Sequence, residues 1–163
     1  MDFEAPGDAW YVWVGVTVVS IGLAGFALSL PGQPPPDADD VAGPIERIAA
    51  GGYDASASVS HDATAVRIDH DRIAVRNEGG RDEAHISFGV MIPLWTLEVS
   101  ARDRQALEAV VIGSRTLDES LESTLADAMT TRNAETGEWR PVSDSLSARA
   151  VTIDGERVVL IMT

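Results

Sequence analysis

An apolar run near the N-terminus constrains this chain more than any other feature. Residues 10–30 read WYVWVGVTVVSIGLAGFALSL, and no charged residue occurs between Asp8 and Asp37. A helix of about 21 residues is about 31 Å long, which matches the roughly 30 Å hydrocarbon core of a bilayer. Trp10, Tyr11 and Trp13 gather at one end of the run, where aromatic rings favour the membrane interface. We therefore predict one transmembrane helix over residues 9–30.

A cleaved signal peptide is the main alternative to a retained anchor. Signal peptides begin with a basic segment, whereas the first eight residues here read MDFEAPGD and are acidic. A prepilin signal would carry a basic residue just before the apolar run, and Asp8 occupies that place. We expect the helix to stay on the protein, which predicts a single-pass protein of the cell membrane.

The orientation of the anchor is weakly constrained. No basic residue precedes the helix, and the first one after it is Arg47. The positive-inside rule therefore favours a cytoplasmic domain only faintly. An anchor followed by a spacer and a small β-rich domain commonly displays that domain outside the cell. We expect the soluble domain outside, with the cytoplasm as the alternative.

Small residues form a stripe along the apolar run. Gly15, Gly22 and Ser29 repeat every seven residues, and Gly25 falls between them. Such a stripe allows a second membrane helix to approach closely. The stripe predicts a helix–helix contact with another membrane protein, although small residues are also common in membrane helices generally.

Four segments follow from these patterns. We assign residues 1–8 to an acidic tail, 9–30 to the transmembrane helix, 31–40 to a linker and 41–163 to a soluble domain. The linker reads PGQPPPDADD, and its prolines predict an extended, solvated spacer.

The remaining periodicity predicts an α+β domain. We expect a short helix capped by Asp39 or Asp40, an antiparallel β meander, two helices and a C-terminal β hairpin. The expected elements are a helix to about Ala50, strands at 53–60, 66–68, 73–75, 84–90 and 94–99, a helix from Ser100 to Gly113, a helix with a Thr116/Glu119 capping box and an end at Asn133, and strands at 138–142, 147–153 and 157–162 around an Asp154-Gly155 turn.

The charge of the chain limits its possible partners. Acidic residues number 26 against 12 basic ones, the net charge is −14, and every basic residue is arginine. This composition is typical of proteins that stay soluble at high salt, with an arginine-favouring GC-rich genome as the alternative explanation. The arginines are scattered singly along the sequence, with Arg102 and Arg104 the only close pair. Nucleic acid requires a basic surface, so we predict no nucleic-acid binding.

Side chains capable of catalysis or metal binding occur without a recognisable pattern. His61-Asp62 and Asp69-His70-Asp71 lie in predicted turns and could hold a weakly bound cation, but we favour the simpler interpretation that acidic residues serve turn propensity and solubility there. The chain has no cysteine, no nucleophile elbow and no glycine-rich phosphate loop. Trp95 and Trp139 could line a groove, although we expect both in the core. We predict no catalytic residue, no cofactor and no metal site.

The opening DFEAPGDAWYVWVGVTVVSIGLAGFALSLPGQPPPDA, with the acidic, lysine-free remainder, resembles a haloarchaeal family of uncharacterised single-pass membrane proteins. The resemblance is strongest over the first 38 residues and carries no catalytic residue. It implies an accessory role beside an archaeal pilus-like or secretion assembly. We therefore expect a membrane-tethered, non-catalytic interaction domain. A tethered sensor of a small ligand is the alternative, and a membrane-anchored hydrolase ranks third.

Overall fold

Helix α1 covers Ala9–Ser29. The computed structural model describes residues 9–29, 32–131 and 137–163, and it divides into two units, Met1–Gly32 and Gln33–Thr163. All side chains from Trp10 to Ser29 are exposed. The segment is long and apolar enough to cross a membrane. An apolar helix with no protein around it would be poorly solvated by water.

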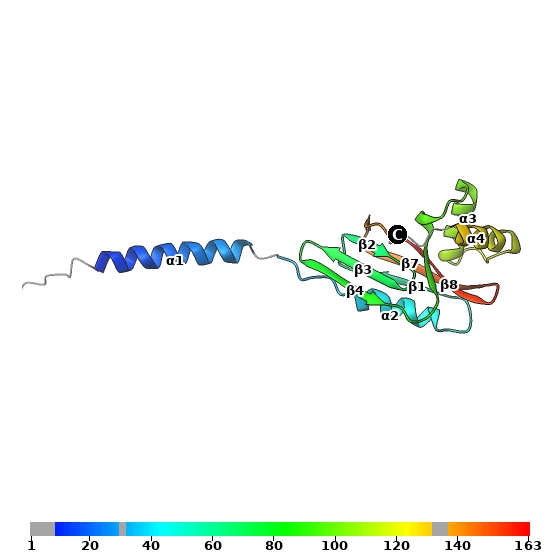
Figure 1. The fold of residues 1–163 in the computed structure, drawn as a ribbon, viewed down its shortest axis with the longest axis horizontal. Coiled ribbons are helices and arrows are strands. Elements are labelled where there is room, and N and C mark those ends of the chain that lie inside the picture. The colour runs from blue at the N-terminus through cyan, green and yellow to red at the C-terminus, as the bar shows by residue number, and fades with distance from the viewer. Residues whose placement is uncertain (1–8, 30–31, 132–136) are drawn as a thin grey trace, which may run out of the picture. The chain divides into compact units, whose positions relative to one another are not determined.

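The second unit is a mixture of helices and strands, which confirms the α+β prediction (Figure 1). Its described elements are α2 (Ala38–Ala49), β1 (Ala55–Ser60), β2 (Ala65–Ile68), β3 (Arg72–Asn77), β4 (Gly80–His85), β5 (Val90–Pro93), the 3-10 helix η1 (Leu94–Thr96), α3 (Ala101–Val111), α4 (Glu119–Thr131), β6 (Arg140–Pro141), β7 (Ser145–Ile153) and β8 (Glu156–Met162).

The strands form two sheets of four strands. Sheet A has the order β1-β7-β8-β5, and sheet B has the order β4-β3-β2-β6. All neighbouring strands are antiparallel except β5 and β8, which run parallel. The predicted meander is confirmed for β2, β3 and β4. The expectation for β1 is wrong, because this strand pairs with β7 in the other sheet.

The single strand expected over 84–90 is also wrong. β4 ends at His85 in sheet B and β5 begins at Val90 in sheet A, so the chain changes sheet between them. Gly89 permits this change because it has a φ of +77° and lies close to β8. A Cβ at this position would lie 3.1 Å from the carbonyl oxygen of Arg157.

The strand expected over 94–99 is replaced by the 3-10 helix η1 and a short extended segment. Pro93 cannot donate a backbone hydrogen bond, which discourages a longer strand. Arg104 then donates to the carbonyl oxygens of Leu94 and Leu97, both at 2.8 Å. A side chain ten residues away in sequence therefore satisfies backbone groups that a sheet would otherwise have used.

Strand β8 of sheet A is buried on both faces, whereas the edge strand β1 exposes its serines. One face packs with α2 and sheet B in a core cluster that includes Val159 and Ile161, and the other packs with α3 and α4 in a cluster that includes Val158 and Leu160. These four residues alternate along β8, which lies between β7 and β5. The prediction of a central terminal strand that is apolar on both faces is thus confirmed.

The turn between β7 and β8 has the predicted geometry. Asp154 has a φ of +50° and Gly155 a φ of +82°. Positive φ at both central residues is the requirement of the tight hairpin turn that Asp-Gly favours. The Asp154-Gly155 hairpin is confirmed.

Helix α3 begins and ends where the sequence predicts. The Ser100 hydroxyl accepts a hydrogen bond from the Asp103 backbone N–H at 3.2 Å, and Gly113 follows the helix with a φ of +79°. A serine at the N-terminus and a left-handed glycine at the C-terminus are the favoured helix ends. The predicted apolar stripe of Leu107, Val110 and Val111 is buried.

Helix α4 has a different cap from the predicted Thr116/Glu119 capping box. Asp118 precedes the helix, and its carboxylate accepts the Leu121 backbone N–H at 3.0 Å. The Arg115 guanidinium beside Asp118, with further hydrogen bonds, lowers the pKa of that carboxyl from 3.8 to about 2. A charged acceptor satisfies the free N–H groups better than a threonine hydroxyl does. The predicted end at Asn133 lies outside the described residues.

The N-terminal edge of the domain also differs from the prediction. Helix α2 is capped by Asp37, which accepts the Asp39 N–H at 2.9 Å, and not by Asp39 or Asp40. Pro36 is buried, and the Pro34 carbonyl oxygen accepts a hydrogen bond from Asn77 at 3.0 Å. Residues 33–40, expected in the solvated linker, therefore belong to the second unit.

Candidate functional site

The outer face of sheet B carries charged side chains, and its inner face belongs to the apolar core. Along β3, Ile73 and Val75 are buried in the core, so Arg72 and Arg76 point to the opposite side. Cross-strand register places Arg81 and His85 of β4, and Arg67 of β2, on the same side. Four of the chain's 12 arginines share this surface. We define the arginine face as Arg67, Arg72, Arg76, Arg81 and the adjacent Trp139.

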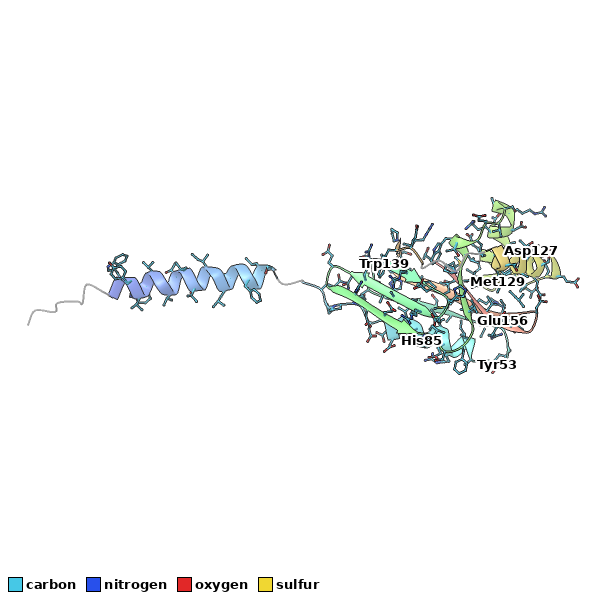
Figure 2. The ribbon with its side chains drawn as sticks, viewed as in Figure 1. Tyr53, His85, Asp127, Met129, Trp139 and Glu156 are labelled. Atoms are coloured by element: carbon cyan, nitrogen blue, oxygen red, sulfur yellow. The ribbon has the colours of Figure 1, made fainter. Side chains whose placement is uncertain are left out.

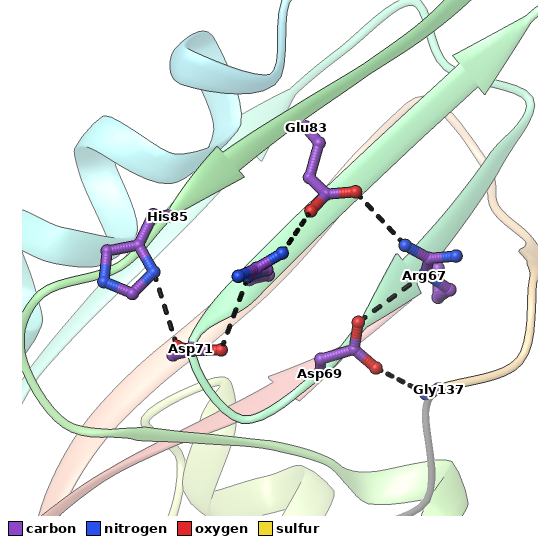
Figure 3. Close-up of polar contacts among 7 residues, drawn as sticks. Arg67, Asp69, Asp71, Glu83, His85 and Gly137 are labelled. Carbon is purple, nitrogen blue, oxygen red and sulfur yellow. Dashed lines mark hydrogen bonds and ion pairs between the residues drawn. The ribbon is translucent and has the colours of Figure 1, made fainter.

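Glu83 links two of these arginines (Figure 3). Its two carboxylate oxygens each lie 3.2 Å from a guanidinium nitrogen, one of Arg67 and one of Arg72. Arg67 also lies 3.6 Å from an oxygen of Asp69. These contacts neutralise Arg67 and Arg72 locally, and partial exposure limits what each pair contributes to stability.

The turn between β2 and β3 contributes the rest of this network. The second oxygen of Asp69 accepts the Gly137 backbone N–H at 2.5 Å. Asp71 lies 3.5 Å from the Nδ1 atom of His85 and 4.0 Å from Arg72 (Figure 3). The carbonyl oxygen of His70 accepts the Met91 N–H at 3.0 Å. The acidic residues of Asp69-His70-Asp71 thus lie beside arginines, His85 and a backbone N–H of the fold.

Trp139, labelled in Figure 2, packs against two arginines of sheet B and belongs to neither core cluster, which corrects our expectation for it. The Arg76 guanidinium carbon is 4.4 Å from its ring centroid and that of Arg67 is 5.5 Å away. The ring is half-buried. Stacking of guanidinium on an indole face is favourable because of the ring quadrupole. The predicted strand at 138–142 is reduced to Arg140–Pro141, just after this ring.

Trp95 behaves as predicted. It packs against the core cluster between sheet A and sheet B. Its outer side is covered by Arg140, whose guanidinium carbon lies 5.5 Å from the ring centroid. The two tryptophans of the second unit therefore have different roles, one as part of the core and one as part of a surface.

The arginines are less scattered than the sequence suggests, because strand pairing brings them together. Arg76 and Arg81 are direct cross-strand partners. Among the described residues, neither forms an ion pair with a carboxylate. The expectation that no arginine cluster exists is wrong at this face. The register around the β3–β4 turn was the signal that could have revealed it.

A cleft of about 510 Å³ lies near the N-terminal end of α2. Its lining residues include Asp37, Asp40, Asp62, Asp144 and His61. Both ring nitrogens of His61 are buried without a hydrogen-bond partner in the described part of the chain. The structure thus brings His61 and Asp62 beside further carboxylates. Among the described residues, no group of three or more His, Asp or Glu side chains has the arrangement of a metal site.

The predicted stripe on α1 is open along its described length. An added Cβ at Gly15, Gly22 or Gly25 would meet nothing within 4 Å. The Ser29 hydroxyl donates to the Phe26 carbonyl oxygen at 2.7 Å, so it is satisfied within the helix. The helix–helix contact through these residues stays a prediction.

Comparison with known proteins gives one match, to a family model. No curated protein matches the chain. No solved structure matches it either. A family model described as "Family of unknown function (DUF7283)" matches residues 4–151, which include α1 and most of the second unit. The chain therefore belongs to this family of unknown function.

Proposed function

We propose that this protein is a membrane-tethered, non-catalytic interaction domain. The observation that carries the proposal is the exposed apolar helix α1, which leads into a separately packed unit beginning at Gln33. An apolar helix of this length is stable in a bilayer, and the second unit then stays close to the membrane surface. The arginine face gives that unit a surface on which a partner can dock.

The finer proposal places the protein in the cell membrane of a salt-adapted archaeon, with the second unit outside the cell. There it serves as an accessory component of a pilus-like or secretion assembly. The acidic, lysine-free composition and the resemblance of the first 38 residues support this view. The small residues along α1 would contact a helix of the same assembly.

Extraction of cell membranes tests the tether. The full chain should remain in the membrane fraction after washing with high salt and with alkaline carbonate. Val19→Asp, in the middle of α1, should move a large share into the soluble fraction, because a central charge costs about 3 kcal/mol in a membrane helix. Val19→Leu is the matched control and should stay in the membrane. Recovery of the wild-type chain in the aqueous fraction would refute the tether.

Labelling of an introduced cysteine tests the orientation. The sequence has no cysteine, and Ser58 is exposed on β1, so Ser58→Cys provides one reactive thiol. A membrane-impermeant maleimide should label it in intact cells if the second unit is outside. Labelling only after permeabilisation would place the unit in the cytoplasm.

Purification of the protein from membranes solubilised at high salt tests the proposed assembly. It should recover pilus or secretion subunits reproducibly.

A tethered sensor is the second candidate, because the cleft beside His61 gives a small ligand space to bind. A ligand in the cleft should raise the unfolding temperature of the wild-type protein and not that of His61→Ala. A thermal-shift screen of small polar metabolites measures this difference. Equal shifts in both proteins would place binding elsewhere.

A further inference from the structure

Two arginines of the arginine face stand directly opposite each other, and within residues 9–29, 32–131 and 137–163 neither pairs with a carboxylate. Arg76 on β3 and Arg81 on β4 are cross-strand partners, and both are exposed. Like charges in directly opposed positions destabilise a sheet. Residues 33–163 contain 23 acidic residues and 12 arginines, a net charge of −11. A carboxylate opposite either arginine would be the more stabilising choice, so the juxtaposition of the two charges does not itself stabilise the sheet.

The surroundings hold the pair in place. Arg76 packs on the ring of Trp139, whose other neighbour, Arg67, is paired with Glu83. Glu83 also pairs with Arg72, so both of its oxygens are already engaged. The nearby carboxylate is thus used by the other two arginines of the face. No carboxylate in the described part of the chain neutralises Arg76 or Arg81, so both charges can pair with a group of another molecule.

We infer that the arginine face docks an acidic segment of another protein, with Arg76 and Arg81 pairing with two of its carboxylates. The inference rests on the proposed interaction function and names its partner chemistry. Guanidinium groups bind carboxylates in two-point geometry, and tryptophan and arginine are enriched among the residues that dominate protein interfaces. Two free arginines suit a short acidic segment. Nucleic acids and anionic membranes engage larger basic clusters than two arginines.

Binding of a defined acidic peptide tests the inference. The full chain in zwitterionic detergent micelles is titrated into fluorescein-labelled octaglutamate, with octaglutamine as the uncharged comparison, and polarisation gives Kd. Arg81→Glu should weaken octaglutamate binding by about tenfold or more, because it removes one charge-assisted contact and adds a repulsion. Octaglutamine should bind neither protein.

A matched charge reversal separates the face from overall charge. Arg102 is exposed on α3, outside sheet B, so Arg102→Glu makes the same change elsewhere. It should alter Kd by less than about twofold, since exposed charges at a distance are screened by salt. Equal weakening by both variants would overturn the inference. A second outcome would also overturn the inference. In it, the wild-type protein binds phosphatidylglycerol vesicles or single-stranded DNA more tightly than octaglutamate, and Arg81→Glu abolishes that binding.

The unfolding temperature provides a second readout. Arg81→Glu places a carboxylate opposite Arg76, so it should leave the unfolding temperature unchanged or higher while peptide binding falls. A lower unfolding temperature would show that the arginine pair has a structural role, against the inference. The membrane fraction of Arg81→Glu should equal that of the wild type. Loss of peptide binding and loss of the tether are therefore measured separately.

Discussion

Replacing Ile45 by alanine tests how the two sheets are held together. Ile45 lies in the middle of α2, is fully buried, and belongs to the cluster shared by α2, sheet A and sheet B. Contacts of α2 reach β1, β3, β4, β7 and β8. No other α-helix contributes a buried residue to this cluster among the described residues. The contribution of the Ile45 side chain to stability therefore reports on the packing of α2 against sheet A and sheet B.

The expected loss can be worked from burial. Ile→Ala removes three carbon groups at about 0.8 kcal/mol each, which gives about 2.4 kcal/mol of transfer free energy. Strands of both sheets pack against the buried face of α2, so the space cannot close fully, and the remaining cavity adds about 1 kcal/mol. The better helix propensity of alanine returns less than about 0.5 kcal/mol. The free energy of unfolding should fall by about 3 kcal/mol, which lowers the unfolding temperature by about 10 °C.

Urea titration of the full chain in non-ionic detergent measures this loss. Far-UV circular dichroism follows the second unit, with the helix in the micelle as a constant background. Ile112→Ala is the matched control, since Ile112 is 62% exposed and should lose less than about 0.5 kcal/mol. If Ile45→Ala lowered the free energy of unfolding by less than about 1 kcal/mol, or by as much as Ile112→Ala does, the packing of α2 against both sheets would be refuted.

Three further changes have defined outcomes. Gly79→Ala should cost about 1–3 kcal/mol in the same titration, because its Cβ would overlap the backbone of Gln33, whereas Gly52→Ala meets nothing within 4 Å and should be near neutral. Equal costs would mean that residues 33–36 are not held at the β3–β4 turn. The folded-state pKa of Asp118 is lowered from 3.8 to about 2, so its stabilising effect is present above pH 3.8 and disappears towards pH 2. The stability difference between wild type and Asp118→Asn should shrink over that range in urea titrations, and a constant difference would contradict the ion pair. Gly155→Ala should cost about 1–2 kcal/mol in thermal unfolding, because φ is +82° there, and a neutral result would argue against the left-handed turn.

Local chemistry explains the parts of the fold that the sequence predicts well. Helix α3 begins at Ser100 because a hydroxyl satisfies a free N–H, and it ends before Gly113 because glycine adopts a positive φ. The Asp154-Gly155 hairpin needs only two residues for its geometry. It is harder to predict from the sequence which of several nearby residues caps a helix. Asp37 and Asp118 were missed because several acidic residues lie near each helix start.

Part of the arginine face could also be predicted. The meander and its alternation place Arg72, Arg76 and Arg81 on one side, provided that the register of the β3–β4 hairpin is known. The position of Trp139 could not be predicted, since it depends on β6 pairing with β2 from more than 60 residues away in sequence. Nothing local in the sequence specifies that pairing.

The sequence by itself determined the apolar helix at the N-terminus, the α+β class of the second unit, and the ends of elements that a few neighbouring side chains or a turn control. The tertiary structure decided which sheet each strand joins, how far the domain extends towards the helix, and which charges meet on sheet B. The physical reason is the separation in sequence of the interacting residues. Caps, turns and apolar periodicity are satisfied within one or two turns of chain, whereas strand partners are selected by burial of both sheet faces and by hydrogen bonds between distant segments.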